Sequence, residues 1–441
     1  MTLSGLTQVS FGALWFVPTS FISQGCNVLG TAAVATILGP QEFGLFSIIR
    51  VTQISFAALS TMGLSATTTR ILAEFRNSDP VRCGRVVGLA YAGSVCAASL
   101  LSLLTIAAGN WLSTDASSPR SQRIATYAVG LLIVVAAVDA VQTGVFAGLR
   151  RFDLFGRLNV VMAVLSAALC IAGAYFTGVN GVVMCMVVAA VVRALWFHSF
   201  VHSELKHHGI RISVEHMLAE VRGVAKFSLP LLLTSICIPI ATWGSNLILA
   251  GRPDGLAAVG VYNLGAQLMV LALAPPNMLI TVAVPTLIET SAARRYKEFS
   301  QLKWGLAAGV SVLVCLLSAV ILAGGGRMVK LFGLRYAGVI TIMPVILATA
   351  VLSAFSSALR GSLMADTSQW KPAVASVVYG LVLVCLTSAF VAQGAEGRAY
   401  ATFWADAALL ICMLFLSADQ SRTHLKHTAV TLAVPKDVRC L

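Results

Sequence analysis

Long apolar runs alternate with short polar segments along the whole chain. Each run is close to the roughly 20 residues that an α-helix needs to cross the hydrocarbon core of a membrane. The connecting segments are short and carry turn-forming residues, as in TGVNG (177–181) and QGAEG (393–397). The pattern predicts an all-α polytopic membrane protein with twelve spans, at approximately 11–37, 44–68, 86–108, 124–148, 158–177, 181–200, 228–250, 257–285, 304–324, 340–360, 372–392 and 398–417.

Composition agrees with this class, and the charges orient the chain. Hydrophobic residues make up 58% of the 441 residues and charged residues 11%, against about 25% charged residues in soluble proteins. With a cytoplasmic N-terminus, 21 of the 30 Lys and Arg residues fall on the cytoplasmic side, the side that retains positive charge. The opposite side then holds seven: Arg120, Arg123, Arg252, Arg327, Lys330, Arg335 and Arg398.

This asymmetry predicts that both termini are cytoplasmic, which an even number of spans also requires. The net charge of +13 is therefore an orientation signal and a contact for anionic membrane lipids. It does not indicate a nucleic-acid partner.

Cysteine and histidine predict no cofactor or metal. Most of the ten cysteines fall inside spans and none forms a C-x-x-C pair, so we expect free, buried thiols. His198 and His202 have the i, i+4 spacing that a metal site uses, but no Cys or carboxylate pattern accompanies them. A solvated, pH-sensitive loop is the preferred interpretation, and a metal is the alternative.

A faint internal repeat predicts the domain organisation. EFGLF (42–46) after the first span is matched by AVGVY (258–262) after the seventh, 216 residues later. A weaker pair, GLRRFDLFGRLNVV (148–161) and GSLMADTSQWKPAV (361–374), has a similar displacement. Six spans per copy is an even number, so both copies would cross the membrane in the same direction, related by a pseudo-two-fold axis along the membrane normal. We expect lobes at 1–200 and 227–417, a cytoplasmic inter-lobe loop at 201–226 and a cytoplasmic tail at 418–441.

Polar residues inside the spans are the candidate site, because a charge in hydrocarbon costs roughly 2.5–3.5 kcal/mol and should face the bundle or a wet cavity. They lie on several spans, which implies a shared polar lumen. In the first half they are Ser20, Gln24, Asn27 and Thr31, then Arg50 with Gln53, Asp139 with Gln142 and Thr143, and Arg193. In the second half they are Ser235, Thr242, Asn246, Asn263, Gln267, Thr402 and Asp406.

Each charge also has a purely structural interpretation. Arg50 and Arg193 could reach toward the headgroups from within their spans, and Asp139 could simply pair with Arg193 or Arg50. Amides and hydroxyls on spans are often hydrogen-bond partners between helices. Arg360, at a cytoplasmic span end, is expected to be interfacial.

Three stretches resemble one family. ILGPQEFGLFSIIRVTQISFAALSTMGLSATTTRILAEF (37–75) is similar to the opening of the Wzx-type polysaccharide flippases, the polysaccharide-transport branch of the multidrug/oligosaccharidyl-lipid/polysaccharide (MOP) exporter superfamily. VGVYNLGAQL (259–268), followed by VPTLIE (284–289), resembles that family's eighth helix, and LFGLRYAGVITIMPVI (331–346) resembles the beginning of its tenth. The similarity extends over the whole chain.

The resemblance implies a V-shaped pair of six-helix lobes that moves a polyprenyl-pyrophosphate-linked oligosaccharide from the cytoplasmic to the periplasmic leaflet. Basic residues in the family's lumen are thought to hold the pyrophosphate, and Arg50 matches in position while Arg193 matches more loosely. Many relatives carry an acidic residue late in helix seven, where this chain reads GSNLIL (244–249). That departure weakens any ion coupling based on helix seven.

The leading hypothesis is thus a flippase of the bacterial inner membrane that works by alternating access in lipopolysaccharide or exopolysaccharide synthesis. Gln24, Asn27, Gln53, Asn263 and Gln267 would bind the sugar. Arg50 and Arg193 would offset the phosphate charge, while Asp139 and Asp406 are candidates for H⁺ or Na⁺ coupling. Partners would be the lipid-linked substrate, membrane lipids and a polysaccharide polymerase or export machinery.

Two alternatives remain. A cation-coupled multidrug antiporter usually needs a carboxylate on its first helix, where this chain has amides and hydroxyls. A membrane polysaccharide polymerase, an enzyme, would need a long outer loop with acid and base residues, and the outer segments 109–123 and 325–339 contain only Asp115. No G-x-x-x-x-G-K-[ST] motif occurs, so ATP is not the direct driver.

Overall fold

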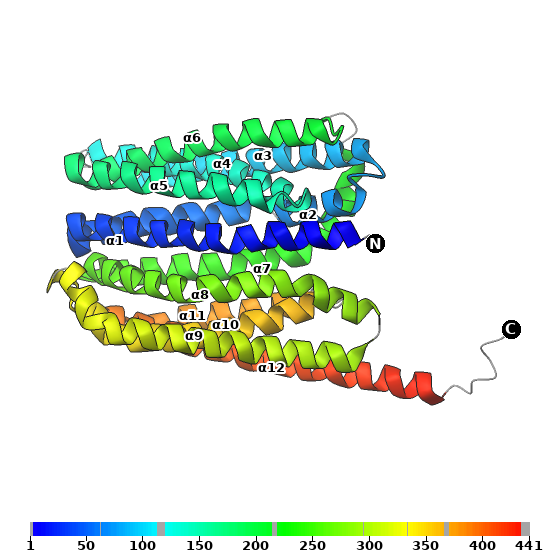
Figure 1. Ribbon diagram of the computed structural model, residues 1–441. Coiled ribbons are helices and arrows are strands. Elements are labelled where there is room, and N and C mark those ends of the chain that lie inside the picture. The colour runs from blue at the N-terminus through cyan, green and yellow to red at the C-terminus, as the bar shows by residue number, and fades with distance from the viewer. Residues whose placement is uncertain are drawn as a thin grey trace.

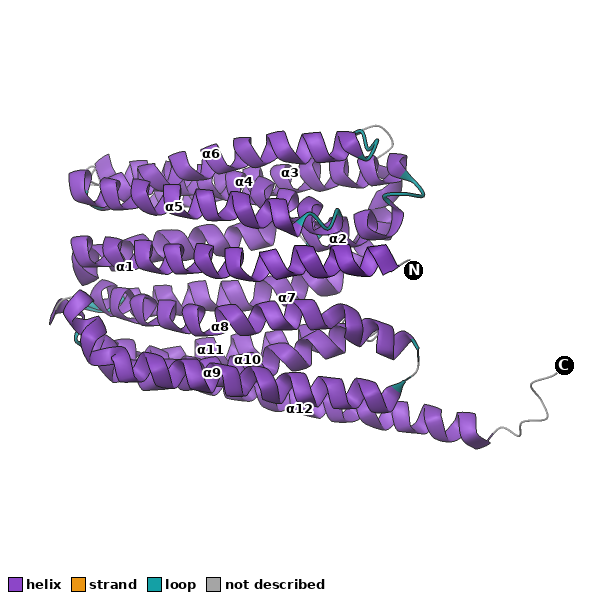
Figure 2. Ribbon diagram, viewed as in Figure 1, coloured by secondary structure: helices purple, strands orange, loops and turns teal. Residues whose placement is uncertain are grey.

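The computed structural model describes residues 3–61, 63–112, 120–213, 218–293, 295–332, 334–365 and 370–433. Within these ranges the regular elements are all helices (Figure 2). They are α1 (Leu3–Thr61), α2 (Leu64–Phe75), α3 (Pro80–Leu112), α4 (Arg120–Gly148), α5 (Phe152–Thr177), α6 (Val179–His207), α7 (Leu218–Ala250), α8 (Gly255–Ala292), α9 (Tyr296–Phe332), the 3₁₀ helix η1 (Leu334–Tyr336), α10 (Gly338–Ala365), α11 (Trp370–Phe390), the 3₁₀ helix η2 (Val391–Gln393) and α12 (Gly394–Ala433).

The predicted spans are confirmed as helices, with two pairs of them joined end to end. The described residues contain ten apolar helical stretches long enough to cross a membrane. One of these, Pro18–Thr61, holds the first two predicted spans, and another, Trp370–Asp419, holds the last two. The first pair is divided at Gly39, whose backbone is non-helical with φ +78° and which Pro40 follows. Because two of the ten stretches contain two spans each, the total is twelve spans.

The structure differs from the prediction at two helix ends. The second span, predicted as continuous over 44–68, is interrupted at Gly63, whose left-handed φ of +71° begins the separate helix α2. Such a backbone is accessible to glycine because it has no Cβ. The last span begins at Gly394 rather than 398. Arg398, predicted as the first residue of this span and counted on the outer side, therefore lies four residues inside α12, and only 1% of it is exposed.

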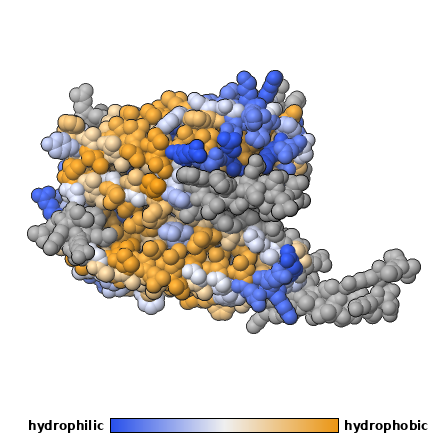
Figure 3. All heavy atoms as spheres, in the orientation of Figure 1, coloured by the Kyte–Doolittle hydropathy of each residue, from blue (hydrophilic) through white to orange (hydrophobic). Residues whose placement is uncertain are grey.

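The helices form two lobes (Figure 1). The N-lobe comprises α1 to α6 and the C-lobe comprises α7 to α12, with α1 packed against α7 and α8 where they meet. The beginning of α1 and the end of α12 lie at the same end of the bundle, as the even span number requires. Figure 3 shows hydrophilic residues gathered at that end and hydrophobic residues over the middle of the molecule.

The connections at the lobe boundaries are short. The helix α6 continues to His207 and α7 begins at Leu218, so both ends of the segment predicted as the inter-lobe loop are helical. Residues 214–217 of this segment lie outside the described residues. The helix α12 continues to Ala433, into the predicted tail.

The two repeat copies meet between the lobes, close to the turn at Gly39. A Cβ on Gly44 would lie 1.8 Å from the Leu256 carbonyl oxygen, and a Cβ on Gly260 would lie 2.1 Å from the Pro40 carbonyl oxygen. Gly44 and Gly260 are 216 residues apart, as are Pro40 and Leu256, so the two contacts are equivalent under the repeat. Reciprocal contacts between equivalent residues are what a two-fold axis produces. The repeat read from the sequence is therefore expressed in the structure, and we call these four residues the glycine seam.

Candidate functional site

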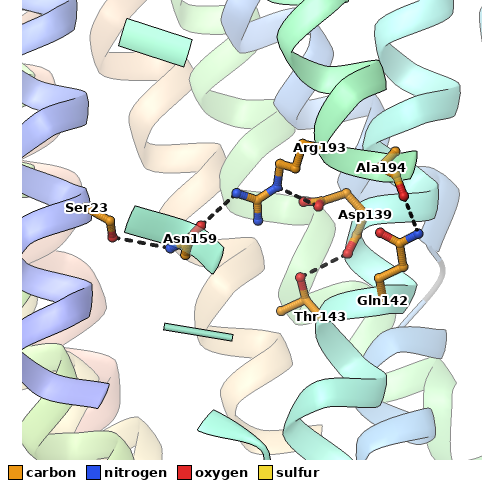
Figure 4. A network of polar contacts seen from close by, with 7 residues as sticks. All are labelled: Ser23, Asp139, Gln142, Thr143, Asn159, Arg193 and Ala194. Carbon is orange, nitrogen blue, oxygen red and sulfur yellow. Dashed lines mark hydrogen bonds and ion pairs between the residues drawn. The ribbon is translucent and has the colours of Figure 1, made fainter. Parts of the chain in front are cut away.

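A charged network ties four helices of the N-lobe together (Figure 4). The Arg193 guanidinium on α6 donates from Nε to Asp139 Oδ1 on α4 at 2.7 Å, and from Nη1 to Asn159 Oδ1 on α5 at 2.7 Å. Asn159 Nδ2 in turn donates to Ser23 Oγ on α1 at 3.3 Å. The ion pair that the sequence left as one of two alternatives for Asp139 is thus formed with Arg193. Asn159 was missed, because a single Asn near the start of a span carries no distinctive signal.

The immediate surroundings of this pair fix its geometry. The Arg193 guanidinium carbon stands 4.4 Å from the centre of the Phe197 ring, one helical turn further along α6. Gln142 Nε2, close to Asp139 on α4, donates to the Ala194 carbonyl oxygen at 3.0 Å. The two charged side chains keep 25% and 28% exposure, so the pair is partly accessible. Arg193 therefore has a counter-ion inside its own lobe.

Arg50 is the other N-lobe guanidinium, and it has no carboxylate partner among the described residues. Its Nη1 donates to Thr31 Oγ1 on the first half of α1 at 3.1 Å. Arg50 lies eleven residues beyond the turn at Gly39, about 16 Å along the helix at 1.5 Å per residue, near the middle of a hydrocarbon core of about 30 Å. Its contact inside the lobe at this depth disfavours the headgroup interpretation.

Thr31 belongs to a polar stripe on the first half of α1. The apolar residues that are most exposed in this part of the helix, Ile22 at 50% and Leu29 at 72%, lie on the opposite face. An exposed apolar face within a span is where lipid is expected. The four stripe residues recur every three or four positions and so share one face of the helix. Asn27 is exposed, and the other three are partly exposed: Ser20, Gln24 and Thr31.

The flanks of this stripe contact different lobes. On one flank Ser23 accepts the bond from Asn159 of the N-lobe. On the other, the Ala35 carbonyl oxygen accepts a hydrogen bond of 2.9 Å from Tyr336 Oη, which belongs to the C-lobe. The stripe therefore lies on the part of α1 where the two lobes face each other, and Arg50 is bonded to it.

The other predicted sugar-binding residues are partly accessible but separate from one another. Gln53, Asn263 and Gln267 are each half-buried. Asn263 Nδ2 donates to the Val259 carbonyl oxygen of its own helix at 2.9 Å. Asn263 and Gln267 share one face of α8 by their i, i+4 spacing. No hydrogen bond joins these three side chains to one another within the described part of the chain.

A second charged cluster, buried in the C-lobe, is centred on Asp406 of α12. Its carboxylate accepts a hydrogen bond from Ser353 Oγ of α10. Arg398 Nη1 donates to Thr402 Oγ1 at 2.5 Å, and the guanidinium carbon lies 4.6 Å from the Tyr262 ring centre on α8. Tyr262 Oη also bonds to Thr402 Oγ1 at 2.9 Å. Asp406 and Arg398 are 3% and 1% exposed.

This C-lobe cluster contains two arginines for one carboxylate. Both Arg360 of α10 and Arg398 interact electrostatically with Asp406. Neither forms an ion pair with it within 4.0 Å among the described residues. Arg360, which the sequence predicted to be interfacial, is partly exposed, and its Nε is buried. The spacing of Arg398, Thr402 and Asp406 at i, i+4 and i+8 could have identified this face from the sequence.

The histidines form no metal centre in the described structure. No group of three or more His, Cys, Asp or Glu side chains is placed to hold a metal ion among the residues searched. The His198 and His202 rings stack with centres 6.4 Å apart, and both residues are exposed.

Comparison with solved structures identifies the fold. The inward-facing conformation of a multidrug resistance MATE family transporter of the MOP superfamily has a TM-score of 0.70 and 14% identity, covering 94% of this chain and 99% of that one. A MOP superfamily transporter from Pyrococcus furiosus, described as having a binding pocket of reversed polarity, has a TM-score of 0.66 and 15% identity, covering 94% and 96%. No curated protein sequence matches.

Sequence comparison identifies the family. Residues 11–291 match the family described as "Polysaccharide biosynthesis protein", which covers well over half of the 441 residues. The matched region includes the N-lobe network, the polar stripe of α1 and the glycine seam. The chain therefore belongs to this family of polysaccharide biosynthesis proteins, and it has the two-lobe membrane fold of the solved MOP superfamily transporters.

Proposed function

We propose that the protein moves a polyprenyl-pyrophosphate-linked oligosaccharide from the cytoplasmic to the periplasmic leaflet of the bacterial inner membrane. The isoprenoid tail would stay in the lipid while the sugar head passes between the lobes. The product would serve the synthesis of a surface polysaccharide such as lipopolysaccharide or exopolysaccharide, together with a polymerase or export machinery.

The observation that carries this proposal is the placement of Arg50. Its guanidinium lacks a carboxylate partner among the described residues, and it is bonded to Thr31 on the polar stripe between the lobes. A partly buried cation without a counter-ion is a favourable site for an anionic group. Gln24 and Asn27 of the same stripe supply amide donors and acceptors of the kind that bind sugar hydroxyls. Arg193, already neutralised by Asp139, is the weaker phosphate candidate.

The glycine seam supports movement by alternating access. It lies close to the turn at Gly39, at the end of the bundle opposite the N-terminus, and it brings the backbones of α1 and α8 together. Phe43 and Tyr336 pack edge to face beside it, with ring centres 6.4 Å apart. For the sugar head to leave on that side, these backbones must separate. The described conformation is thus closed at the end predicted to be periplasmic.

Coupling to an ion remains part of the proposal. Asp139 is bonded to Arg193, and Asp406 is flanked by two arginines, so positive charge surrounds each carboxylate. A Na⁺ ion would be repelled by those guanidiniums, whereas a proton would neutralise the carboxylate covalently. H⁺ is therefore the coupling ion that suits these residues better.

The test is leaflet exchange in proteoliposomes. A fluorescent pyrophosphate-linked oligosaccharide should be translocated by the wild-type protein, and Arg50→Gln should lower the rate at least tenfold with normal membrane insertion. Arg295→Gln, which removes an exposed guanidinium from an ion pair with Glu298, is the matched control and should keep the rate. Equal rates in all three proteins would refute the role of Arg50.

The same vesicles distinguish the flippase hypothesis from the multidrug antiporter hypothesis, since one structural neighbour is described as a multidrug resistance transporter. A cationic dye replaces the sugar lipid as substrate. Dye export under a proton gradient without movement of the sugar lipid would overturn the flippase proposal in favour of the antiporter.

A further inference from the structure

The C-lobe cluster has more positive than negative charge, with Arg398 and Asp406 buried and Arg360 partly exposed but with a buried Nε. Arg360, Arg398 and Asp406 are its charged members, and all three interact electrostatically. With an ionised carboxylate the cluster carries one excess positive charge, and with a protonated carboxylate it carries two. An uncompensated charge in a protein interior is strongly unfavourable, so a counter-charge is expected.

The cluster also contains buried donors without partners among the described residues. They are Arg360 Nε, Arg398 Nε and the hydroxyl of Ser356. Ser356 and Arg398 are each 1% exposed, so bulk water does not satisfy them. A buried donor that stays unpaired is destabilising, and more so when it is charged.

These donors are arranged on two facing helices. On α10, Ser353, Ser356 and Arg360 recur at i, i+3 and i+7 and therefore share a face. Ser353 contacts Asp406 of α12, which shows that this face of α10 is turned toward α12. On α12, Arg398 lies two turns before Asp406 on the same side. Ser356 and Arg360 thus lie one and two turns beyond Ser353 on the face of α10 that is turned toward Asp406.

We propose that this cluster binds a small monovalent inorganic anion, with the Arg360 guanidinium and the Ser356 hydroxyl as ligands and Arg398 as the second positive charge. One negative charge balances the excess left by Asp406. A guanidinium N–H and a hydroxyl are the donors that halide and similar anions bind. A divalent anion such as sulfate would replace an excess positive charge by an excess negative one.

This site is distinct from the lumen proposed for the sugar lipid. Tyr262 is 7% exposed and Tyr379 6% exposed, and both interact with the charged members from α8 and α11. The cluster is therefore enclosed by C-lobe helices and shares no residue with the stripe on α1. Anion binding here would stabilise the C-lobe whether or not the sugar lipid is the substrate.

Thermal unfolding of the purified full-length protein in detergent tests the proposal. About 0.1 M sodium chloride is compared with the same concentration of sodium gluconate, and sodium sulfate is a third condition at equal ionic strength. Since a ligand that binds only the folded state raises its stability, chloride should raise Tm by about 2 °C or more over gluconate. Sulfate should behave like gluconate. An equal Tm for the wild-type protein in chloride and gluconate would overturn the proposal.

Variants locate the effect. Arg360→Gln, which keeps the size and removes the charge, should abolish the gain from chloride, while the surface control Arg295→Gln should retain it. If Arg360→Gln does not fold, Ser356→Ala, which removes one neutral ligand, is used in its place. Ser356→Ala should raise at least threefold the chloride concentration that gives half of the Tm gain. A chloride gain that is unchanged in Ser356→Ala and Arg360→Gln would place the anion elsewhere and refute this site.

Discussion

The two lobes solve the same problem, a charge in the membrane interior, in different ways. In the N-lobe, Arg193 and Asp139 meet directly at 2.7 Å, one cation to one anion. In the C-lobe, Arg360 and Arg398 share Asp406 without an ion pair within 4.0 Å in the described structure. In the N-lobe pair the positive and negative charges are equal in number. The C-lobe cluster has one more positive than negative charge, which the proposed anion would balance.

This difference in charge balance suggests a structural role for the N-lobe network and a binding role for the C-lobe cluster. The Arg193 network connects four helices through consecutive hydrogen bonds, as Figure 4 shows, so its energy goes into holding the N-lobe helices together. The C-lobe cluster keeps buried donors unused. The repeat relates the backbones of the two lobes but not these side chains, so the lobes have diverged in their chemistry while keeping their fold.

The largest effect is expected from removing the single carboxylate of the C-lobe cluster. Asp406→Ala leaves two buried guanidiniums with no acid between them, and breaking a buried pair by removing one partner costs about 3–5 kcal/mol. Unfolding by SDS titration measures the change. Arg360→Met in the same chain should restore only part of the loss, because Arg398 stays uncompensated, and Arg398→Met must be added for the rest.

The N-lobe pair should give a smaller loss and a simpler rescue. Arg193→Ala leaves Asp139 unpaired, but because this carboxylate is 28% exposed, the expected loss is about 2 kcal/mol, below the buried range. The double variant Arg193→Met with Asp139→Leu should recover most of it in the same SDS titration. If two substitutions also sufficed in the C-lobe, the contrast between the balanced pair and the unbalanced cluster would be wrong.

An intermediate effect is expected from the hydroxyl that bonds to Asp406. Ser353→Ala removes a hydrogen bond to a charged group, worth about 1.5–3 kcal/mol. Ser376→Ala is the matched control, because this buried hydroxyl donates to the Pro372 carbonyl oxygen of its own helix at 3.0 Å. SDS titration of both variants compares them. Equal losses of stability would mean that the hydrogen bond from Ser353 to Asp406 contributes no more than a hydrogen bond from a serine to its own helix backbone.

Much of the fold was predictable because it depends on patterns that one chain displays. Span length gives the helices, and the match of EFGLF to AVGVY gives the repeat, whereas the direction of the helices across the membrane stays a prediction. The contact between Gly44 and Gly260 follows from that repeat once a two-fold axis is assumed. The interruption at Gly63 was not predictable, since a glycine inside a span is compatible with an unbroken helix.

The candidate site was predictable in its residue types but only partly in its pairings. Asp139 had two possible partners on different spans, and only packing decides between them. The start of α12 was predicted four residues late, so the burial of Arg398 inside this helix was not expected. Which arginines of a span are buried is set by tertiary packing rather than by the local sequence.

The smallest effect tests how far the N-lobe network extends. Ser23 on α1 is the last member, and its Oγ accepts from Asn159 at the long distance of 3.3 Å. Hydrogen bonds between membrane helices contribute about 0.6 kcal/mol on average, so Ser23→Ala should destabilise the protein by about that amount. Ser60→Ala is the control, because this equally buried hydroxyl donates to the Ala57 carbonyl oxygen in its own helix. A double-mutant cycle of Ser23→Ala with Asn159→Ala then isolates the link. A coupling energy of zero would end the network at Asn159 and leave α1 outside it.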